Sequence, residues 1–401
     1  MKPLVLSGRA DFTTGYDDLV GREVLRARAA PAFSISDIGK KDVALVRSSA
    51  DAISARTAGF ESVLAVGDSG RDAIVNSSFK KSISLPNDFE YVDDGDVFGF
   101  HPASKRIRVH YRRASKHNAF LVTERCNHYC LMCSQPPKNV DDSWILDDIA
   151  ASLDLMDCET QTIGFTGGEP LLDWQRFISI LAIARDRLPN TAVHVLTNGR
   201  AFAIADVTQA WSALGHFNLC AGIPLYSAVD SLHDYVVQAK GAFDETVLGI
   251  LRLKDEGQRV EVRVVLHKLT AGRLLETCTW LARNMPFLDH VALMGLENTG
   301  FAIANENMLW IDPLDYRAEL AKGIEILVSA GLKTSIYNLP LCLLDRSAWP
   351  YAVQSISDWK NAYLPECEHC AVRSKCSGFF TTGRLRKSRG IQPVPAHPVG
   401  S

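Results

Sequence analysis

The 401-residue chain is long enough for two or three domains, and its composition is that of a globular protein. Hydrophobic residues make up 47% and charged residues 22%, which excludes wholesale disorder, and a formal net charge of -3 argues against a general nucleic-acid binder. No apolar segment approaches the roughly 20 residues that span a bilayer, and the first residues lack the apolar core of a secretory signal. We therefore expect a cytoplasmic protein without membrane contact.

Residues 1–118 show short alternating apolar runs, scattered Gly and Asp, and a hairpin-like stretch, DDGDVFGFHPASKRIRVHYRR. This pattern predicts an N-terminal accessory domain that is β-rich or α+β. Its basic run, residues 105–117, holds six Lys or Arg and no acid. We interpret the run as a solvated β-ribbon. The functional alternative is a dock for an acidic leader peptide or a small acidic electron-donor protein.

From residue 119 onward, short apolar runs alternate with segments of helical period, which indicates parallel strands joined by right-handed crossovers. Six such units are too few for an eight-fold closed barrel. The predicted fold is therefore α/β, a partial (β/α)6 TIM-type barrel over residues 119–310. The six predicted strands are 119–124, 161–166, 192–197, 217–225, 260–267 and 290–296.

The last part of the chain is divided into two segments. Residues 311–383 begin with a helical pattern and continue as a loop-rich, cysteine-bearing extension. Residues 384–401 are basic and rich in Pro and Gly without periodicity, so we expect a disordered tail.

Ten cysteines in a chain without a secretory signal should be reduced, so clustered cysteines suggest a metal site or catalysis. The isolated Cys158, Cys220 and Cys278 are interpreted as small buried hydrophobes.

The first cluster, in LVTERCNHYCLMCSQPPK, places Cys126, Cys130 and Cys133 directly after the first predicted barrel strand. The carboxyl ends of barrel strands are where such folds carry their chemistry. Three thiolates on one loop can bind three corners of a [4Fe–4S] cluster and leave the fourth iron without a protein ligand. The alternative is a zinc site, which would need His128 or a distant residue as its fourth ligand.

Two further motifs follow the next strands. TGGEP places Gly167, Gly168, Glu169 and Pro170 after the second strand, where paired glycines let backbone approach a ligand and Glu169 can accept hydrogen bonds from an ammonium group. LTNGR places Thr197 and Asn198 after the third strand, where they could meet ribose hydroxyls. Taken alone, LTNGR is better explained as a simple Asn-Gly turn.

Together these motifs resemble the radical SAM superfamily over roughly residues 119–300, although Met132 stands where members often carry an aromatic residue. The resemblance implies a [4Fe–4S] cluster on Cys126, Cys130 and Cys133, with S-adenosylmethionine (SAM) on the open iron. It places the GGEP residues near the SAM amino group. Ser227 and Arg263 are candidates for a SAM carboxylate contact, the alternative for Arg263 being a solvent-facing strand residue. No catalytic side chain is assigned.

The second cluster is formed by Cys342, Cys367, Cys370 and Cys376, and its C-x2-C spacing also suits zinc. Behind a radical SAM barrel it resembles the auxiliary-cluster extension of the SPASM and twitch type. This resemblance implies one fully ligated auxiliary [4Fe–4S] cluster. The cluster could accept an electron from the substrate, or it could have only the structural role of stabilising the extension.

Three segments resemble the peptide-modifying radical SAM maturases, and within them the His-Xaa-Ser system maturase family. They are SLHDYVVQAKGAFDETVLGILRLKDEG, the MCSQPPK ending of the first cluster, and SISDWKNAYLPECEHCAVRSKCSGFF. The resemblance implies a ribosomal precursor peptide as substrate and a sister radical SAM maturase as partner. The alternatives are radical SAM chemistry on a small molecule or RNA, RNA being disfavoured by the near-neutral charge, and a zinc-bound structural scaffold.

Overall fold

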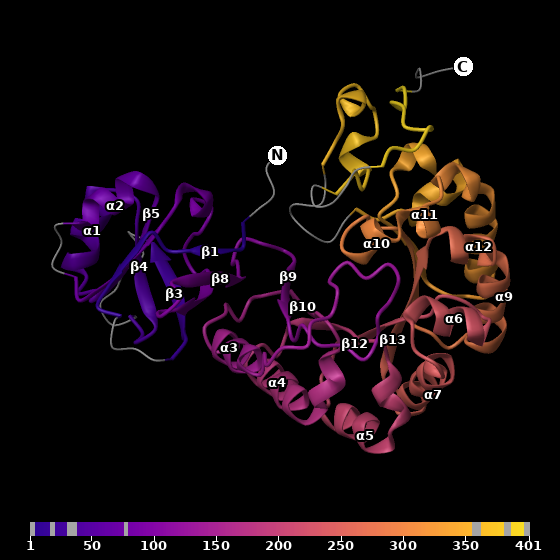
Figure 1. Cartoon of the computed structure of the whole chain (residues 1–401), viewed down its shortest axis with the longest axis horizontal. Coiled ribbons are helices and arrows are strands. Elements are labelled where there is room, and N and C mark those ends of the chain that lie inside the picture. The colour runs from indigo at the N-terminus through magenta and orange to yellow at the C-terminus, as the bar shows by residue number, and fades with distance from the viewer. Residues whose placement is uncertain are drawn as a thin grey trace.

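The computed structural model describes residues 5–16, 21–29, 38–75, 79–354, 362–380 and 386–396, and its two sheets are both visible in Figure 1. The N-terminal sheet has the order β1-β8-β7-β3-β4-β5-β6-β2. Strands β3 to β6 are mutually parallel, whereas β1, β2, β7 and β8 pair antiparallel. The predicted hairpin is the β7–β8 pair.

Strands and helices alternate between β4 and β6 in the N-terminal domain. The domain therefore has more α/β character than the β-rich alternative predicted. Helices α1 and α2 connect the parallel strands β4, β5 and β6. The bounds are β1 (Ser7–Arg9), β2 (Phe12–Thr14), β3 (Glu23–Ala29), β4 (Asp42–Val46), α1 (Ser49–Thr57), β5 (Ser62–Val66), α2 (Gly67–Val75), β6 (Lys81–Leu85), η2 (Asn87–Phe89), β7 (Val97–His101) and β8 (Arg106–Tyr111).

The second sheet is entirely parallel, and its strands lie in chain order from β9 to β15. This confirms the partial barrel, and each of the six predicted strands overlaps one of β9 to β14. The described residues add a seventh strand, β15, which lies beyond the predicted barrel boundary at residue 310. The strands are β9 (Asn118–Leu121), β10 (Thr162–Thr166), β11 (Ala192–Leu196), β12 (Leu219–Pro224), β13 (Arg259–Leu266), β14 (His290–Gly295) and β15 (Thr334–Tyr337).

Helices cover the outer face of this sheet and form an arc in Figure 1. The helices are α3 (Trp144–Leu153), α4 (Trp174–Arg187), α5 (Ala205–Ala213), α6 (Asp230–Val237), α7 (Ala242–Asp255), α8 (Lys268–Ala271), α9 (Leu274–Asn284), α10 (Phe301–Ala304), α11 (Glu306–Leu309) and α12 (Arg317–Ser329). Short 3-10 turns complete this part and the extension: η3 (Pro170–Asp173), η4 (Arg200–Ala203), η5 (Pro313–Asp315), η6 (Leu341–Leu343), η7 (Arg346–Tyr351), η8 (Pro365–Cys367) and η9 (Arg373–Lys375).

The period of two in β13 explains why the barrel has two different faces. Val260, Val262 and Val264 are buried in the core shared with the helices. Glu261 and Arg263, on the opposite face of the strand, are only partly buried, and they contact His290 and Met294 of the neighbouring strand β14. The alternation therefore packs apolar side chains outward under the helices and leaves charged ones inside the barrel.

Charged and aromatic contacts join the N-terminal sheet to α3. Arg22 pairs with Asp148 at 2.8 Å and lies 3.6 Å above the ring of Trp144. His110 Nδ1 lies 2.9 Å from the Ser152 hydroxyl. The expected basic ribbon is therefore only partly solvated.

Several cations of the 105–117 run are partnered within the chain. Arg112 lies over the Tyr91 ring, and Arg113 Nε lies 2.6 Å from Asp157 Oδ2. Arg108 lies in β8, and its burial lowers the pKa of its guanidinium. This distribution gives little support to the run as a dock for an acidic partner.

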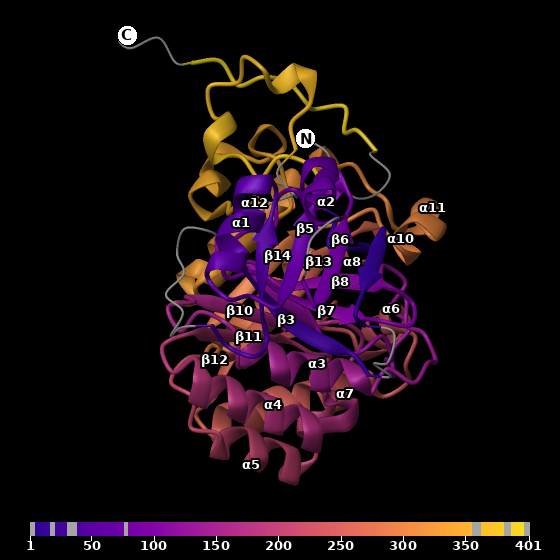
Figure 2. The same ribbon diagram turned by 90° about the vertical axis from the view of Figure 1, so that its left-hand side faces the viewer.

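The end of the chain differs from the disordered tail expected over residues 384–401. Residues 386–396 are described, and they pack on the extension. The buried Asp312 carboxylate accepts hydrogen bonds from Ser388 Oγ at 2.5 Å and from the Arg389 amide at 3.0 Å. A buried carboxylate needs such donors, and composition alone does not reveal them. Figures 1 and 2 place this segment at the end of the barrel opposite α4 and α5. Residues 384–385 and 397–401 lie outside the described ranges.

None of the helices in the described ranges combines the length and apolar character that crossing a bilayer requires.

Acid should weaken the junction between the N-terminal sheet and α3. Burial, together with the Arg108 and Arg22 cations, lowers the pKa of His110 from 6.5 to about 3. Below pH 6.5 the unfolded chain therefore binds a proton that the folded chain does not, and stability falls as pH decreases. Between about pH 7 and about pH 5.5, urea denaturation should show the wild type losing about 1 kcal/mol more unfolding free energy than His110→Gln. Equal losses would contradict this account.

Candidate active site

The first cysteine group lies on the loop that follows β9. Cys126, Cys130 and Cys133 are all half-buried. The His128 amide donates to Cys126 Sγ at 3.4 Å, and the Cys133 thiol donates to the Gln135 carbonyl at 3.0 Å. Burial raises the pKa of the Cys130 thiol, and charge on the nearby Cys133 or Cys126 thiols would raise it further. The structure thus brings the predicted triad together.

Segments distant in sequence hold this loop in place. The amides of Tyr129 and Leu131 donate to carbonyls at the end of α6, at 3.1 and 2.9 Å. Asn305, between α10 and α11, donates its side-chain amide to the Leu131 carbonyl at 2.8 Å. The Phe301 amide donates to the Cys133 carbonyl at 2.9 Å. The loop is therefore held by segments that follow β12 and β14 in the sequence.

The glycine pair meets the cysteine loop through its backbone. The Gly168 amide donates to the Thr123 carbonyl at 2.7 Å, and the Glu169 amide to the Arg125 carbonyl at 2.9 Å. A Cβ on Gly168 would lie 1.8 Å from the Arg125 oxygen. Gly167 has a φ of +130°, which side chains rarely tolerate. Both glycines are thus required for the loops after β9 and β10 to touch.

Glu169 links this junction to the next strand end. Its buried carboxylate accepts hydrogen bonds from Thr197 Oγ1 at 2.7 Å, the Asn198 amide at 2.6 Å and the Leu171 amide at 3.0 Å. Asn198 Nδ2 continues the network to Asn127 Oδ1, beside Cys126, at 2.6 Å. Burial raises the pKa of Glu169, and these hydrogen bonds oppose the shift. The predicted residues after β10 and β11 therefore form one connected group with the cysteine loop.

Three predicted cofactor residues have local roles in the structure. Pro170 is buried at the first position of η3, where a missing amide hydrogen has no cost. Ser227 is fully buried after β12, and its Oγ accepts a hydrogen bond from the Val229 amide at 3.0 Å. Arg263 is on the inner face of β13 and is not solvent-facing. Its Nε lies 3.4 Å from Glu261 Oε1, and its Nη2 lies 3.2 Å from the Met294 sulfur.

A polar network inside the barrel was missed by sequence reasoning. Glu261 Oε2 lies 2.6 Å from His290 Nδ1, His290 Nε2 lies 2.9 Å from Ser335 Oγ, and His194 Nε2 lies 3.5 Å from Glu261 Oε1. Burial alone would raise the pKa of Glu261, but the His290 hydrogen bond and the nearby cations lower it to about 2. The sequence did contain a sign of this network. Glu261 and Arg263 alternate with valines in β13, which places both charged side chains on one face of the strand.

The second cysteine group is also assembled. Cys342 lies in η6 directly after β15, and Cys367, Cys370 and Cys376 come from the extension. Burial raises the pKa of the Cys342 and Cys376 thiols, and charge on the nearby Cys367 would raise both further. Backbone amides donate to the sulfurs: Leu341 to Cys376 and Val394 to Cys370, each at 3.4 Å. Such N–H···S bonds favour the thiolate form that binds metals.

The donor chemistry of both groups fits iron–sulfur clusters. Burial raises the pKa of the Cys126 thiol to about 11, so a bound metal would be needed to keep it ionised at neutral pH. Within the described ranges, no three His, Cys, Asp or Glu side chains converge to hold a single metal ion. A [4Fe–4S] cluster does not require that convergence, because each thiolate binds a different iron.

Comparison with known proteins identifies the domain that carries the first group. Residues 120–281, from β9 to α9, match the family model described as the Radical SAM superfamily. This match identifies residues 120–281 as a radical SAM domain. No curated protein matches the chain.

Several solved structures resemble parts of the chain at low similarity. Streptococcus suis SuiB bound to S-adenosylmethionine is 13% identical, with 57% of this chain and 51% of SuiB covered and a TM-score of 0.45. Native anSMEcpe with bound AdoMet and Cp18Cys peptide is 14% identical over 54% and 62%, with a TM-score of 0.43. A radical SAM methyltransferase from Sphaerobacter thermophilus is 15% identical over 61% and 73%, with a TM-score of 0.45. The chain spans about half the length of SuiB. At these values the likeness supports no inference about substrate.

The contact between the two loops can be tested by adding one methyl group. Gly168→Ala should lower the free energy of unfolding by about 1–3 kcal/mol, because the new Cβ must displace the Arg125 backbone. Gly272→Ala is the matched control, since a Cβ there meets no atom within 4 Å and the backbone is unstrained. Urea denaturation of both variants measures the difference, and equal stabilities would contradict the close approach.

Proposed function

We propose that this radical SAM enzyme is a maturase that modifies a ribosomally made peptide. The observation that carries the proposal is the placement of Cys126, Cys130 and Cys133 against the Gly167–Gly168 turn within the domain matched by the family model. When bound there, a [4Fe–4S] cluster would supply the electron that cleaves the SAM sulfonium to a 5′-deoxyadenosyl radical, which abstracts a substrate hydrogen.

In this proposal the chain itself holds and orients SAM. The three thiolates leave one iron for the amino and carboxylate groups of SAM, beside Gly167, Gly168, Glu169 and Pro170. Thr197 and Asn198 would lie near the ribose through their backbone. Their side chains are joined to Glu169 and Asn127, so they keep the strand ends in register. Arg263 and Ser227 are the candidates for the SAM carboxylate, Arg263 being the residue with donors facing the barrel interior.

The finer assignments rest on the sequence resemblance to the His-Xaa-Ser system maturases. We propose a precursor peptide with His-Xaa-Ser repeats as substrate, a sister radical SAM maturase as partner, and a small protein as electron donor. The thiols of Cys342, Cys367, Cys370 and Cys376 would hold an auxiliary [4Fe–4S] cluster, a role supported by their grouping and by the N–H···S bonds.

The first cluster assignment predicts a loss of SAM cleavage. Cys126→Ala, Cys130→Ala and Cys133→Ala should each abolish 5′-deoxyadenosine formation under anaerobic, reducing conditions, because a cluster iron loses its ligand. Cys158 is exposed, contrary to the buried position expected from the sequence, and it belongs to neither cysteine group, so Cys158→Ala should cleave SAM like the wild type. Chromatography of 5′-deoxyadenosine measures both. Normal cleavage by a variant lacking all three thiols would refute the assignment.

The second group predicts a separate defect. Cys370→Ala should still produce 5′-deoxyadenosine but give no modified peptide, and its iron content should fall from about eight to about four per chain. Mass spectrometry of a His-Xaa-Ser peptide co-expressed with each variant reports the modification. A wild-type yield of product would show that the auxiliary group is dispensable for turnover.

A further inference from the structure

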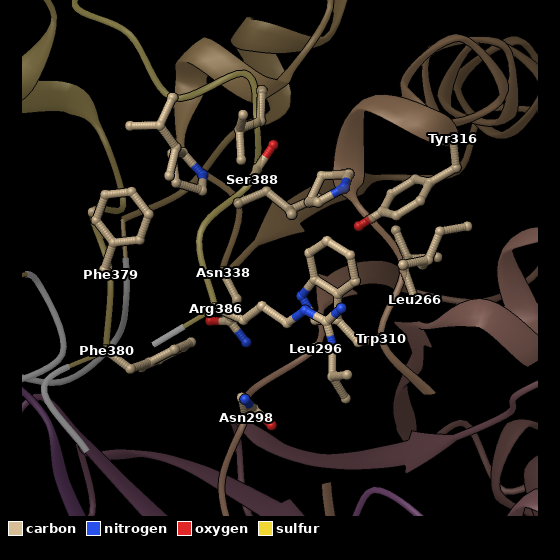
Figure 3. Close-up of a pocket in the computed structure, with 17 residues that line it drawn as sticks. Leu266, Leu296, Asn298, Trp310, Tyr316, Asn338, Phe379, Phe380, Arg386 and Ser388 are labelled. Carbon is tan, nitrogen blue, oxygen red and sulfur yellow. The ribbon is translucent and has the colours of Figure 1, made fainter. Parts of the chain in front are cut away.

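A cavity of about 110 Å³ lies between the barrel mouth and the C-terminal extension (Figure 3). This is several times the roughly 10–15 Å³ that one water needs. Its floor is formed by the residues that follow β13, β14 and β15, including Leu296 and Asn338. Its opposite wall comes from residues 378–380 and 386–391. The cavity therefore exists only because the end of the chain folds back onto the barrel.

The cavity lies between the two cysteine groups. On one side, Leu296 packs in the apolar cluster of Met132 and Cys130, and Trp310 follows Leu309 of the same cluster. On the other side, Pro340 and Leu343 flank Cys342, and Gly378 follows Cys376 by two residues. The cavity lining therefore includes neighbours of both cysteine groups.

Arg386 gives the cavity its chemical character. Its guanidinium lies 3.9 Å above the ring of Trp310, which holds it flat at the cavity wall. Glu306 forms an ion pair with it at 3.7 Å, which is longer than a hydrogen bond, and the Arg386 side chain is 42% exposed. The ring contact and this long ion pair leave N–H groups at the edge of the guanidinium available to a ligand.

Tyr316 and Asn338 bring further hydrogen-bond donors to the cavity, and the Asn338 amide also donates to the Gly295 carbonyl at 3.4 Å. The Ser388 hydroxyl and the Asn298 amide instead donate to the carboxylates of Asp312 and Glu306. In Figure 3 the hydroxyl of Tyr316 points toward the space around Arg386, with the Asn338 amide on another side. Burial raises the pKa of Tyr316, which keeps this hydroxyl protonated. Asn338 has a left-handed backbone, φ 62°, which turns the chain at the end of β15. Of the described residues that line the cavity, none carries a carboxylate.

We propose that this cavity binds a carboxylate-bearing side chain, Asp or Glu, of the peptide substrate. The inference rests on the proposed function and adds a specificity determinant to it. A cation stacked on an aromatic ring, with neutral donors around it and apolar walls, complements a planar anion. The same cation repels Lys and Arg side chains. The pocket thus selects an acidic residue near the modified position of the peptide.

The test uses three small probes on the anaerobically purified full chain, without SAM or reductant. They are the N-acetyl N-methylamides of glutamate, glutamine and lysine, and calorimetry measures their dissociation constants. The glutamate probe should bind about tenfold or more tightly than glutamine, because its hydrogen bonds to Arg386 are charge-assisted, and lysine should not bind. Equal binding of glutamate and glutamine, tighter binding of lysine, or no binding of any probe would overturn the proposal.

Variants of Arg386 test whether this residue causes the preference for glutamate over glutamine. Arg386→Gln should remove the difference between glutamate and glutamine, and Arg386→Lys should keep part of it, because lysine retains the charge without the planar fork. Lys387→Gln is the matched control. It makes the same change of charge one residue away, at an exposed side chain paired with Glu366. A preference that persists in Arg386→Gln, or disappears in Lys387→Gln, would contradict the assignment.

A second measurement tests whether Arg386 binds the carboxylate of SAM and not that of a peptide side chain. Equilibrium dialysis measures SAM binding by the wild type and by each variant of Arg386. Weakened SAM binding with an unchanged glutamate preference would assign Arg386 to SAM and overturn the proposal. Failure of the proposed function would instead appear as no SAM cleavage by the wild type, an assay that does not involve the probes.

Discussion

The candidate site depends on the backbone contact between the turn at Gly168 and the loop at Arg125. The two segments are so close that only hydrogen fits in place of a side chain. Glu169, the next residue, then reaches both Thr197 and the Asn198 amide. One short sequence therefore fixes the ends of three strands and, through Asn127, the position of the cysteine loop.

This contact makes sense in a parallel barrel, whose strand ends converge at one mouth. The cysteine loop, the GGEP turn and the TNG turn all leave the same edge of the sheet. The segments around α6 and α10 hold the loop from the other side, and the extension with the second cysteine group closes over the end of β15. Under the proposed function, such enclosure would keep a reactive radical away from C–H and S–H groups other than those of the substrate.

The sequence predicted the features that depend on local pattern. Strand–helix alternation located six barrel strands, and cysteine spacing found both thiol groups. The features that were missed depend on distant partners. Strand β15 is only four residues long, Glu261 meets His194 and His290 from other strands, and the end of the chain is ordered by the buried Asp312. The resemblance to one maturase family concerned substrate, which the fold does not determine.

The most direct measurement of the central claim is electron paramagnetic resonance of a chain in which only the first cysteine group remains. A protein carrying alanine at Cys342, Cys367, Cys370 and Cys376, reconstituted with iron and sulfide and reduced, should give the signal of one [4Fe–4S]+ cluster. Adding SAM should change its g values, because SAM binds the iron that lacks a protein ligand. No signal, or a signal that SAM leaves unchanged, would contradict an open iron at the loop of Cys126, Cys130 and Cys133.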